Sequence, residues 1–520
     1  MQPRTISDLH AFLSSSNPDR PRLCPEPISL GNRLVLRRAT PADKDALVAF
    51  NGTAHGHMTK FGGWTKDRFE AQDGSGVLPP KAGPESFTVI VDTSKNDLIV
   101  SSCQSIPQVW CYGIPNKRDA PSSLHVPLTV VRPEAIGTLE AYRGRGLIAE
   151  HFKVHHAWAA ALRSELQFIG GIPSYYTRFG YELCPRRGVS YTGHLANIPP
   201  LHATAEPVRF RKATTDDVPF LDRVARAASL AREGIHSDAD AAQWRFLVSE
   251  LWAGSYGTRP FYIIETNDDA SHPIGFVRLN LHKTVTRFEL DEASNVPSKL
   301  SWADVTPALL RWLPRNYLDN CVPFQHLVES LEAQATGADT AAIAPRTQEL
   351  PANWSFTLEL GGCHPGLRAV PSSYVPIQTP SDHWYTRIPS WTAFLRAIAP
   401  VLEHRLASDA AFYAVSRTIV LHKAFRVVGG GTRLRIECGR VAAIDDIPRG
   451  VSENDLVKAE PDADRVLLPG TIACSLFLGH RTLSELLHQQ HQVHVSAPHV
   501  PTLLDVLFPP MANDEIHGLQ

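Results

Sequence analysis

The spacing of apolar residues changes several times between residues 128 and 182, and each change predicts a new element. The apolar run over 128–139, interrupted near Pro133, predicts a buried strand. After a polar turn at 142–146, apolar residues at 147, 148, 152, 159 and 162 share one helical face that can pack on a sheet. Residues 168–182 then predict a strand, a turn, a short helical segment and a further strand.

A second pattern is an internal repeat near the start of the chain. Residues 33–43 resemble residues 207–217, and five positions recur 174 residues later: Arg37, Ala39, Thr40, Asp43 and Leu47 return as Arg211, Ala213, Thr214, Asp217 and Leu221. Each copy predicts a half-buried strand, then a threonine that caps a helix and an aspartate in its positive first turn. The repeat indicates that one domain is present twice.

The last third of the chain predicts a separate unit of mixed α and β structure. A strand is expected at 384–388, followed by a helix over 391–406 with apolar residues on one face. Strands are expected at 419–421, 434–436 and 441–444. With proline-rich joints near 199 and 371, we expect an N-terminal extension (1–30), three units (31–200, 201–370 and 371–510) and a C-terminal tail (511–520). The fold class is therefore α+β.

Length and composition agree with several soluble domains. The 520 residues exceed what one core usually holds, and 43% hydrophobic with 20% charged residues is typical of globular proteins. No apolar run reaches the length of a membrane helix, and the first residues lack a secretory signal, so we expect a cytoplasmic protein without membrane insertion. With 51 basic and 53 acidic residues, no overall field attracts nucleic acid. The eight cysteines are scattered, and we expect no metal site.

The turn at 142–146, Tyr-Arg-Gly-Arg-Gly, is the first candidate for chemistry. A strand, a glycine turn and a helix start place several backbone N–H groups around one concavity at the positive end of the helix dipole. This arrangement suits a pyrophosphate, since glycine lacks the Cβ that would hold phosphate oxygens away, and Arg143 and Arg145 add positive charge. The sequence Arg-Gly-Arg-Gly also occurs in disordered nucleic-acid-binding tails and in ordinary turns.

Together, the turn and the later Gly-Ile-Pro-x-x-Tyr-x-Arg-Phe-Gly-Tyr-Glu (171–182) resemble the GNAT superfamily of N-acetyltransferases. More narrowly, the chain resembles the Eis-like (enhanced intracellular survival) branch. This resemblance covers residues from about 30 to about 509. It implies a catalytic GNAT domain, a second, degenerate GNAT domain, a domain similar to sterol carrier proteins, and a homohexamer. It also implies that an acetyl group passes from acetyl-CoA to a primary amine.

The resemblance assigns the cofactor loop and a general acid. The loop comprises Arg143, Gly144, Arg145, Gly146, Leu147 and Ile148, and Ile148 stands where most of the superfamily has glycine or alanine. Tyr176 occupies the place of the general acid, where a phenol can protonate the departing thiolate. Tyr175 is the alternative. The second copy has no Arg-Gly-x-Gly turn between 208 and 360, so we expect it to bind no coenzyme A.

The general base has more than one candidate. Glu134 lies on the strand before the cofactor loop, and the Eis branch implies instead the C-terminal carboxylate, here that of Gln520. The tail does not resemble the aromatic end of that branch, which makes His517 and Glu515 substitutes. We expect the amine pocket to draw on two further segments, through the side chains of His55, His57, Trp110 and Tyr112.

Two other functions remain open on the sequence. In the first, the chain is a non-catalytic protein that binds a lipid or a partner, with a remnant GNAT domain. In the second, it is an acyltransferase that uses a longer acyl-CoA or acts on protein lysines.

Overall fold

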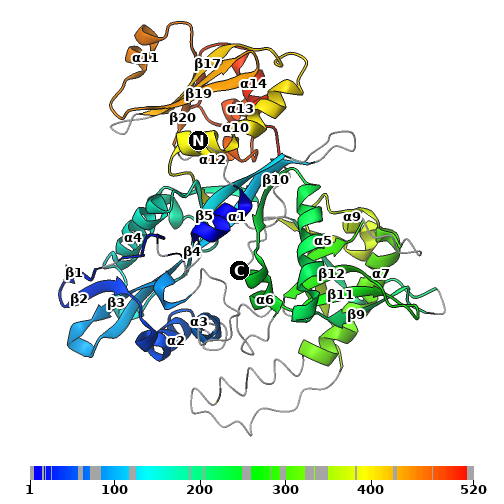
Figure 1. The fold of residues 1–520 in the computed structure, drawn as a ribbon. Helices are drawn as coiled ribbons and strands as arrows, with labels where there is room; N and C mark the ends of the chain where they lie inside the picture. The colour runs from blue at the N-terminus through cyan, green and yellow to red at the C-terminus, as the bar shows by residue number, and fades with distance from the viewer. Residues whose placement is uncertain are drawn as a thin grey trace.

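The computed structural model arranges the chain around three β-sheets (Figure 1). It describes residues 5–13, 17, 19–24, 26–56, 62–70, 83–115, 124–186, 189–202, 205–248, 259–280, 283–292, 300–321, 329, 333, 349–380, 383–424, 430–470 and 472–511. None of the helices within these ranges is long and apolar enough to cross a membrane. The same ranges contain no group of three or more His, Cys, Asp and Glu residues able to hold a metal ion.

The first sheet has nine strands in the order β1-β2-β3-β4-β5-β6-β16-β7, and β10 pairs with the far end of β4. Their bounds are β1 Ile28–Gly31, β2 Leu34–Arg38, β3 Phe87–Asp92, β4 Leu98–Ile114, β5 Leu124–Thr138, β6 Leu166–Ile169, β7 Glu182–Arg186, β10 Gly234–Asp238 and β16 His383–Arg387. The long β4 and β5 are antiparallel over almost their whole length. These two strands form the centre of the first unit, and its other elements pack around them.

Helices cover both faces of this sheet. Helix α4 (Leu147–Ala161) and helix α1 (Ile6–Leu13) share an apolar cluster with Val109 and Val131 on one face. Helices α2 (Lys44–Ala54) and α3 (Gly63–Glu70) share another cluster with Val89 and Ile99. In β3, Val89 belongs to the α2 cluster, whereas the next residue, Ile90, packs with Leu147 of α4. Because successive strand residues point to opposite faces, the two sets of helices lie on opposite sides of the sheet. We call them the α4 face and the α2 face.

The second sheet has the order β15-β8-β14-β13-β12-β11-β9. Its strands are β8 Val189–His194, β9 Val208–Lys212, β11 Phe261–Thr266, β12 Pro273–Asn280, β13 Thr284–Leu290, β14 Ser355–Glu359 and β15 Ile377–Pro380. Helices α5 (Val218–Leu230), α6 (Ala241–Val248), α7 (Trp302–Asn316) and α9 (Pro365–Arg368) accompany it. Strand β8 precedes residue 200 and β15 follows residue 370, so both cross the boundaries expected from the sequence.

The repeat in the sequence is also a repeat in structure. In both copies the arginine and the aspartate form an ion pair of 2.7 Å, Arg37 with Asp43 and Arg211 with Asp217. The same aspartate accepts the backbone N–H of the threonine at 2.8 Å in each copy. The residues recur because they build one motif, in which a 3-10 turn precedes the helix. The aspartate, rather than the threonine hydroxyl, is the main acceptor of that turn.

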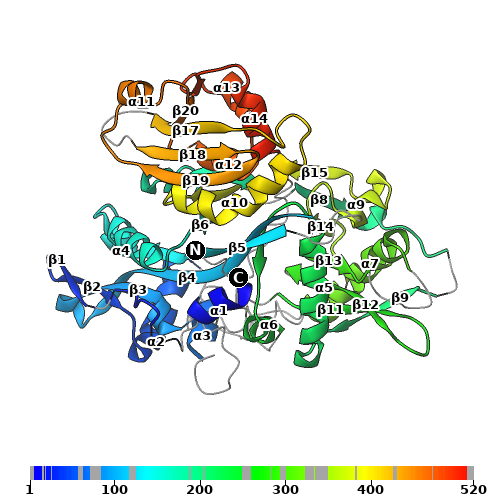
Figure 2. The same ribbon diagram turned by 45° about the horizontal axis from the view of Figure 1, so that its top comes forward.

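The third sheet has the order β19-β18-β17-β20-β21, with strands β17 Arg417–Ala424, β18 Gly431–Glu437, β19 Arg440–Ile447, β20 Asp464–Pro469 and β21 His494–Val495. Helix α10 (Trp391–Ala407) lies between this sheet and the first sheet (Figure 2). The other helices are α11 (Glu453–Ala459), α12 (Ala473–Phe477), α13 (Leu483–Gln489) and α14 (Val500–Leu507). The strand expected at 384–388 does form, as β16, but it pairs within the first sheet.

One apolar cluster joins the third unit to the first. Leu128 and Val130 of β5 belong to the same cluster as Phe394, Ile398 and Leu402 of α10. All five side chains are fully buried. Helix α10 therefore buries apolar surface against the first sheet as well as against its own.

Two buried polar contacts add to this junction. Arg405 of α10 donates to the Tyr112 hydroxyl of β4 (3.0 Å), to the Leu507 carbonyl (2.7 Å) and to the Glu233 carboxylate (2.9 Å), so it touches all three units. Glu182 of β7 accepts hydrogen bonds from the backbone N–H and the hydroxyl of Ser475 in α12. Burial raises the pKa of Glu182 to about 7, although these hydrogen bonds oppose the shift.

We predict that Glu182→Gln changes how stability depends on pH. The folded pKa lies above the ordinary value of 4.5, so the folded chain holds a proton that the unfolded chain releases as the pH rises from about 4.5 to about 7. The wild type should lose about 2–3 kcal/mol of stability across this window, and the neutral glutamine should not. Thermal melting at pH 5 and pH 8 measures this, with the exposed Glu349→Gln as control. Parallel curves for wild type and Glu182→Gln would contradict it.

Candidate active site

Two parallel strands of the first sheet, β5 and β6, pair over a short stretch and then separate, and we call the place where their pairing ends the wedge. Among the described residues, β6 pairs with β5 only at Val130 opposite Leu166 and at Val131 opposite Gln167. Strand β5 continues to Thr138 beside β4 alone, and a bulge beyond Glu134 places Ala135 at φ +46°. Beyond Val131, the edge of β5 that faces β6 has no strand partner. An extended molecule with amide groups can pair with such an edge.

The predicted cofactor loop lies at the start of α4. The 3-10 turn η5 (Glu140–Tyr142) leads into it, and Gly144 and Gly146 both have φ +76°. The backbone N–H groups of residues 144–148 have no hydrogen-bond acceptor within the part of the chain that the structure describes. A Cβ added at either glycine would meet nothing within 4 Å. The loop therefore holds five N–H groups without an acceptor among the described residues, at the positive end of α4 and with open space beside both glycines.

Charged and aromatic side chains pack against this loop and hold it in place. Tyr142 is buried, and its hydroxyl donates to Asp92 at 2.6 Å. The guanidinium of Arg145 lies 4.7 Å from the centre of the Tyr142 ring, and the Lys95 ammonium lies 5.2 Å from it. Arg143 is exposed and donates to the Thr138 carbonyl at 3.3 Å. The loop is thus held in place while two arginines and a lysine give it positive charge.

The remaining loop residues connect it to Tyr176. Leu147 is buried with Tyr142 under the loop, and Ile148 packs against the cluster that holds Tyr176. An aliphatic residue at 148 therefore has a packing role here.

Tyr176 lies on the α4 face beside the wedge. It begins the 3-10 turn η6 (Tyr176–Phe179) and is 6% exposed, and its ring contacts those of Phe152, Tyr175 and Tyr385. Burial raises the pKa of Tyr176, and the negative charge of Glu134 raises it further. The phenol therefore stays protonated near neutral pH. Its hydroxyl has no hydrogen-bond partner among the described residues, which leaves it free to donate to a ligand.

Glu134 lies on the α2 face, on the opposite side of the sheet from Tyr176. It forms an ion pair with Arg132, and its side chain is 22% exposed. The Arg132 guanidinium is fully buried and lies 4.8 Å from the ring centre of Trp384 in β16. Arg68 of α3 stacks on Trp64 at 3.6 Å, and burial lowers the pKa of Arg68 to about 9 while Asp67 and Glu134 oppose that shift.

The other predicted pocket residues lie in different places. His55 ends α2 beside Gly137 of β5, where a Cβ on Gly137 would come within 3.4 Å of His55 Nε2. Burial lowers the pKa of His55, which favours its neutral form. Trp110 stacks on Phe168 at 4.6 Å, and the Tyr112 hydroxyl donates to the Phe477 carbonyl at 3.1 Å. Both are fully buried. They fill the core between the first sheet and the third unit rather than face a ligand.

Four predicted site residues, His57, Glu515, His517 and Gln520, lie outside the described residues. The C-terminal carboxylate of Gln520, the alternative general base, therefore stays a prediction. Of the predicted site, the structure brings together the cofactor loop, Tyr176 and Glu134 around the wedge, with His55 at its far end.

The sequence reading missed Arg132, Arg68, Trp384 and Tyr385. A signal existed for the first of these, because Arg132 and Glu134 are two apart on a strand and so share a face. No local signal shows that Trp384 and Tyr385 enter the first sheet.

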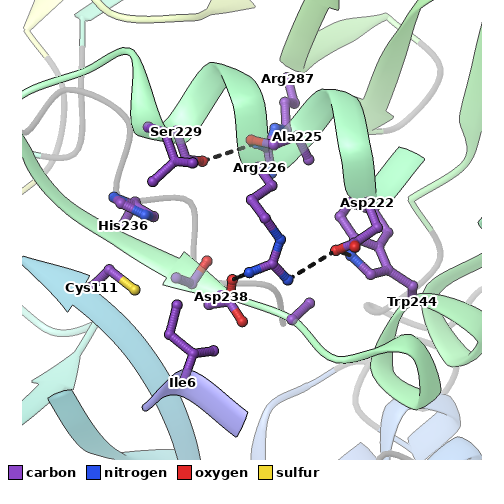
Figure 3. A pocket seen from close by; sticks show the side chains of 13 residues that line it. Ile6, Cys111, Asp222, Ala225, Arg226, Ser229, His236, Asp238, Trp244 and Arg287 are labelled. Atoms are coloured by element: carbon purple, nitrogen blue, oxygen red, sulfur yellow. Dashed lines mark hydrogen bonds and ion pairs between the residues drawn. The ribbon is translucent and has the colours of Figure 1, made fainter. Parts of the chain in front are cut away.

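A separate hollow lies between α5, β10 and β4 (Figure 3). Its volume is about 100 Å³, well below that of a usual ligand site. Arg226 lies between Asp238 (3.1 Å) and Asp222 (3.4 Å), and burial lowers the pKa of His236 to about 3. The opposite charges compensate one another inside the hollow, and we place no substrate there.

No family model matches the sequence, and no curated protein sequence matches it. Solved structures do match. A GCN5-related N-acetyltransferase from Kribbella flavida is 13% identical with a TM-score of 0.53, over 92% of this chain and 98% of that one. A probable N-acyltransferase from Enterococcus faecalis is 12% identical (TM-score 0.55; 92% and 96%). A GCN5-related N-acetyltransferase from Anabaena variabilis is 12% identical (TM-score 0.51; 92% and 97%).

At these identities the likeness concerns the fold. The expected α+β class is confirmed, and over most of its length the chain has the fold seen in GCN5-related N-acetyltransferases.

Proposed function

We propose that the chain transfers an acyl group, acetyl in the first instance, from acyl-CoA to a primary amine at the wedge of the first unit. The observation that carries this proposal is the set of unpaired N–H groups at residues 144–148, next to the open edge of β5. The N–H groups and arginines suit the pyrophosphate of coenzyme A. The open edge suits the amide-containing arm that leads to the thioester.

In this mechanism, the two proton transfers take place on opposite faces of the sheet. The amine approaches from the α2 face, and Glu134 accepts a proton from the ammonium, directly or through water. The neutral amine attacks the thioester carbonyl, the new C–N bond forms, the C–S bond breaks, and the nitrogen, positively charged after attack, releases its second proton to water. The Tyr176 hydroxyl donates its proton to the departing thiolate from the α4 face. Glu134 releases its proton to solvent and Tyr176 regains one from solvent, and the products are an amide and free coenzyme A.

The predictions made from the sequence about the family branch, the second and third units and the oligomeric state are part of this proposal. Likeness to the Eis-like branch rests on the two motifs at 142–147 and 171–182. We also propose that the third unit is similar to sterol carrier proteins and that the second copy binds no coenzyme A. A cytoplasmic homohexamer is the expected state. A lipid-binding role is disfavoured, because the apolar residues of α10 are already buried against protein.

A panel of acceptors tests the function. Acetyl-CoA is incubated with polyamines, aminoglycosides, amino acids and lysine peptides, and thiol release is followed with mass spectrometry of the products. We expect amine-dependent thiol release and a product heavier by one acetyl group. Longer acyl-CoAs in the same assay measure donor preference. Absence of any thermal shift with acetyl-CoA would support a non-catalytic protein.

We predict that Gly146→Ala weakens acetyl-CoA binding by about tenfold or more, because the methyl group would occupy the space in front of the unpaired N–H groups. Isothermal titration with acetyl-CoA measures the affinity. Gly31→Ala is the matched control, since Gly31 has φ +78° and equal free space but lies at the end of β1. It should lose similar stability and keep its affinity. Equal affinity in both variants would place the pyrophosphate elsewhere.

We predict that Tyr176→Phe lowers kcat by about 10²–10⁴ while the Kd for acetyl-CoA stays within about threefold. Phenylalanine keeps the ring contacts with Phe152 and Tyr385 and removes only the proton donor. Steady-state rates with the best acceptor of the panel, together with titration, measure both quantities. Tyr413→Phe is the control, because Tyr413 is 64% exposed. An unchanged kcat would remove Tyr176 from the mechanism.

A further inference from the structure

The first sheet is completed by a strand from a distant part of the chain. β16 (His383–Arg387) lies between β6 and β7, with Tyr385 opposite Ile169 on one side and opposite Leu183 on the other. Nearly two hundred residues separate β7 from β16. Strand β6 stops pairing with β5 after Gln167, while its opposite edge pairs with β16 from Gln167 to Ile169. One side of the wedge therefore depends on this inserted strand.

On the α4 face, β16 presents Tyr385 to the loop before Tyr176. The Tyr385 side chain is 1% exposed, and its hydroxyl accepts a hydrogen bond from the Ser174 N–H. Ser174 has φ +60°, a conformation that residues other than glycine adopt at a cost. The Tyr385 and Tyr176 rings lie 5.4 Å apart at 65°. Tyr385 thus hydrogen-bonds to a strained residue two positions before Tyr176 and also packs against the Tyr176 ring.

The same loop is closely fitted to Tyr176 at a second point. Gly171 has φ +143°, and a Cβ there would lie 3.1 Å from the Tyr176 hydroxyl. A shift of the loop would therefore move the phenol or leave a gap beside it. The hydrogen bond to Tyr385 limits that shift.

On the α2 face, β16 presents Trp384 to the partner of Glu134. The ring of Trp384 lies 4.8 Å from the Arg132 guanidinium, which forms the ion pair with Glu134. Trp384 also meets Phe168 of β6 edge-on at 6.2 Å. The indole therefore fixes the arginine that orients the carboxylate.

We propose that β16 positions both catalytic groups, Tyr176 through Tyr385 and Glu134 through Trp384. This inference rests on the proposed function and adds two positioning residues to it. Adjacent residues of a strand point to opposite faces, so one short strand reaches both sides of the wedge. β16 leads within four residues into α10, and α10 is buried against β5. The third unit consequently helps to fix the positions of Tyr176 and Glu134.

The first test is Tyr385→Phe, which keeps the ring and removes the acceptor of the Ser174 N–H. We expect faster hydrogen exchange in a peptide spanning residues 171–176, measured by mass spectrometry on the full chain without substrate. We also expect kcat to fall about tenfold with an unchanged KM for acetyl-CoA, using the best amine of the panel. A purely structural residue would lower stability without this separation of kcat from KM. Tyr413→Phe should change neither quantity.

The second test is Trp384→Phe, which keeps an aromatic ring but weakens its contact with Arg132. We expect kcat/KM for the amine to fall about fivefold while the KM for acetyl-CoA is unchanged, because a less constrained Arg132 no longer holds the Glu134 carboxylate in one orientation. Hydrogen exchange at 171–176, which Tyr385→Phe should raise, should stay at the wild-type rate in Trp384→Phe. Both variants should keep wild-type affinity for acetyl-CoA.

The outcomes separate this inference from the function on which it rests. If the wild type binds no acetyl-CoA and transfers no acetyl group, the proposed function fails, whatever the exchange data show. If the wild type is active but exchange at 171–176 and kcat are unchanged in Tyr385→Phe, and kcat/KM for the amine is unchanged in Trp384→Phe, the positioning role of β16 is overturned.

Discussion

The separation of β5 from β6 after Val131 is the constraint on which the rest of the site depends. Two parallel strands that stayed paired would satisfy each other's backbone groups and leave no room between them. The bulge at Ala135 lies in the part of β5 that no longer pairs with β6, and β16 pairs with the opposite edge of β6. Among the described residues, one edge of β5 therefore stays unpaired inside a sheet that continues on both sides of it. The unpaired N–H groups at the start of α4 lie in the same unit and extend this polar surface.

The sheet also separates two kinds of environment. The α4 face holds Tyr176 among aromatic rings, where burial keeps the phenol protonated. The α2 face holds Glu134 with Arg132, and Arg68 lies near enough to interact electrostatically with both. A phenol and a carboxylate placed on one face at short range would hydrogen-bond to each other rather than to a substrate. In the proposed mechanism the wedge lets both reach the reacting thioester and amine while the sheet keeps them apart.

The sequence predicted the features that depend on neighbouring residues. The helix at 147–161, the glycine turn before it and the short helical segment at 176–179 follow from local spacing and from the residue types of the turn. Pairing between distant strands leaves no such trace. Strand 384–388 was expected, but nothing in its residues indicates that it inserts between β6 and β7. Trp110 and Tyr112 illustrate the same limit, because a buried aromatic and a pocket aromatic look alike until the packed helix α10 is known.

The second unit takes part in this architecture without a cofactor turn of its own. It supplies β10 to the far end of β4, and it supplies Glu233 to Arg405. A buried guanidinium is costly unless its partners are present, and the partners of Arg405 come from all three units. Separating any unit would leave part of that charge uncompensated. The contacts of the second unit therefore help to fix the position of α10, and with it that of β16.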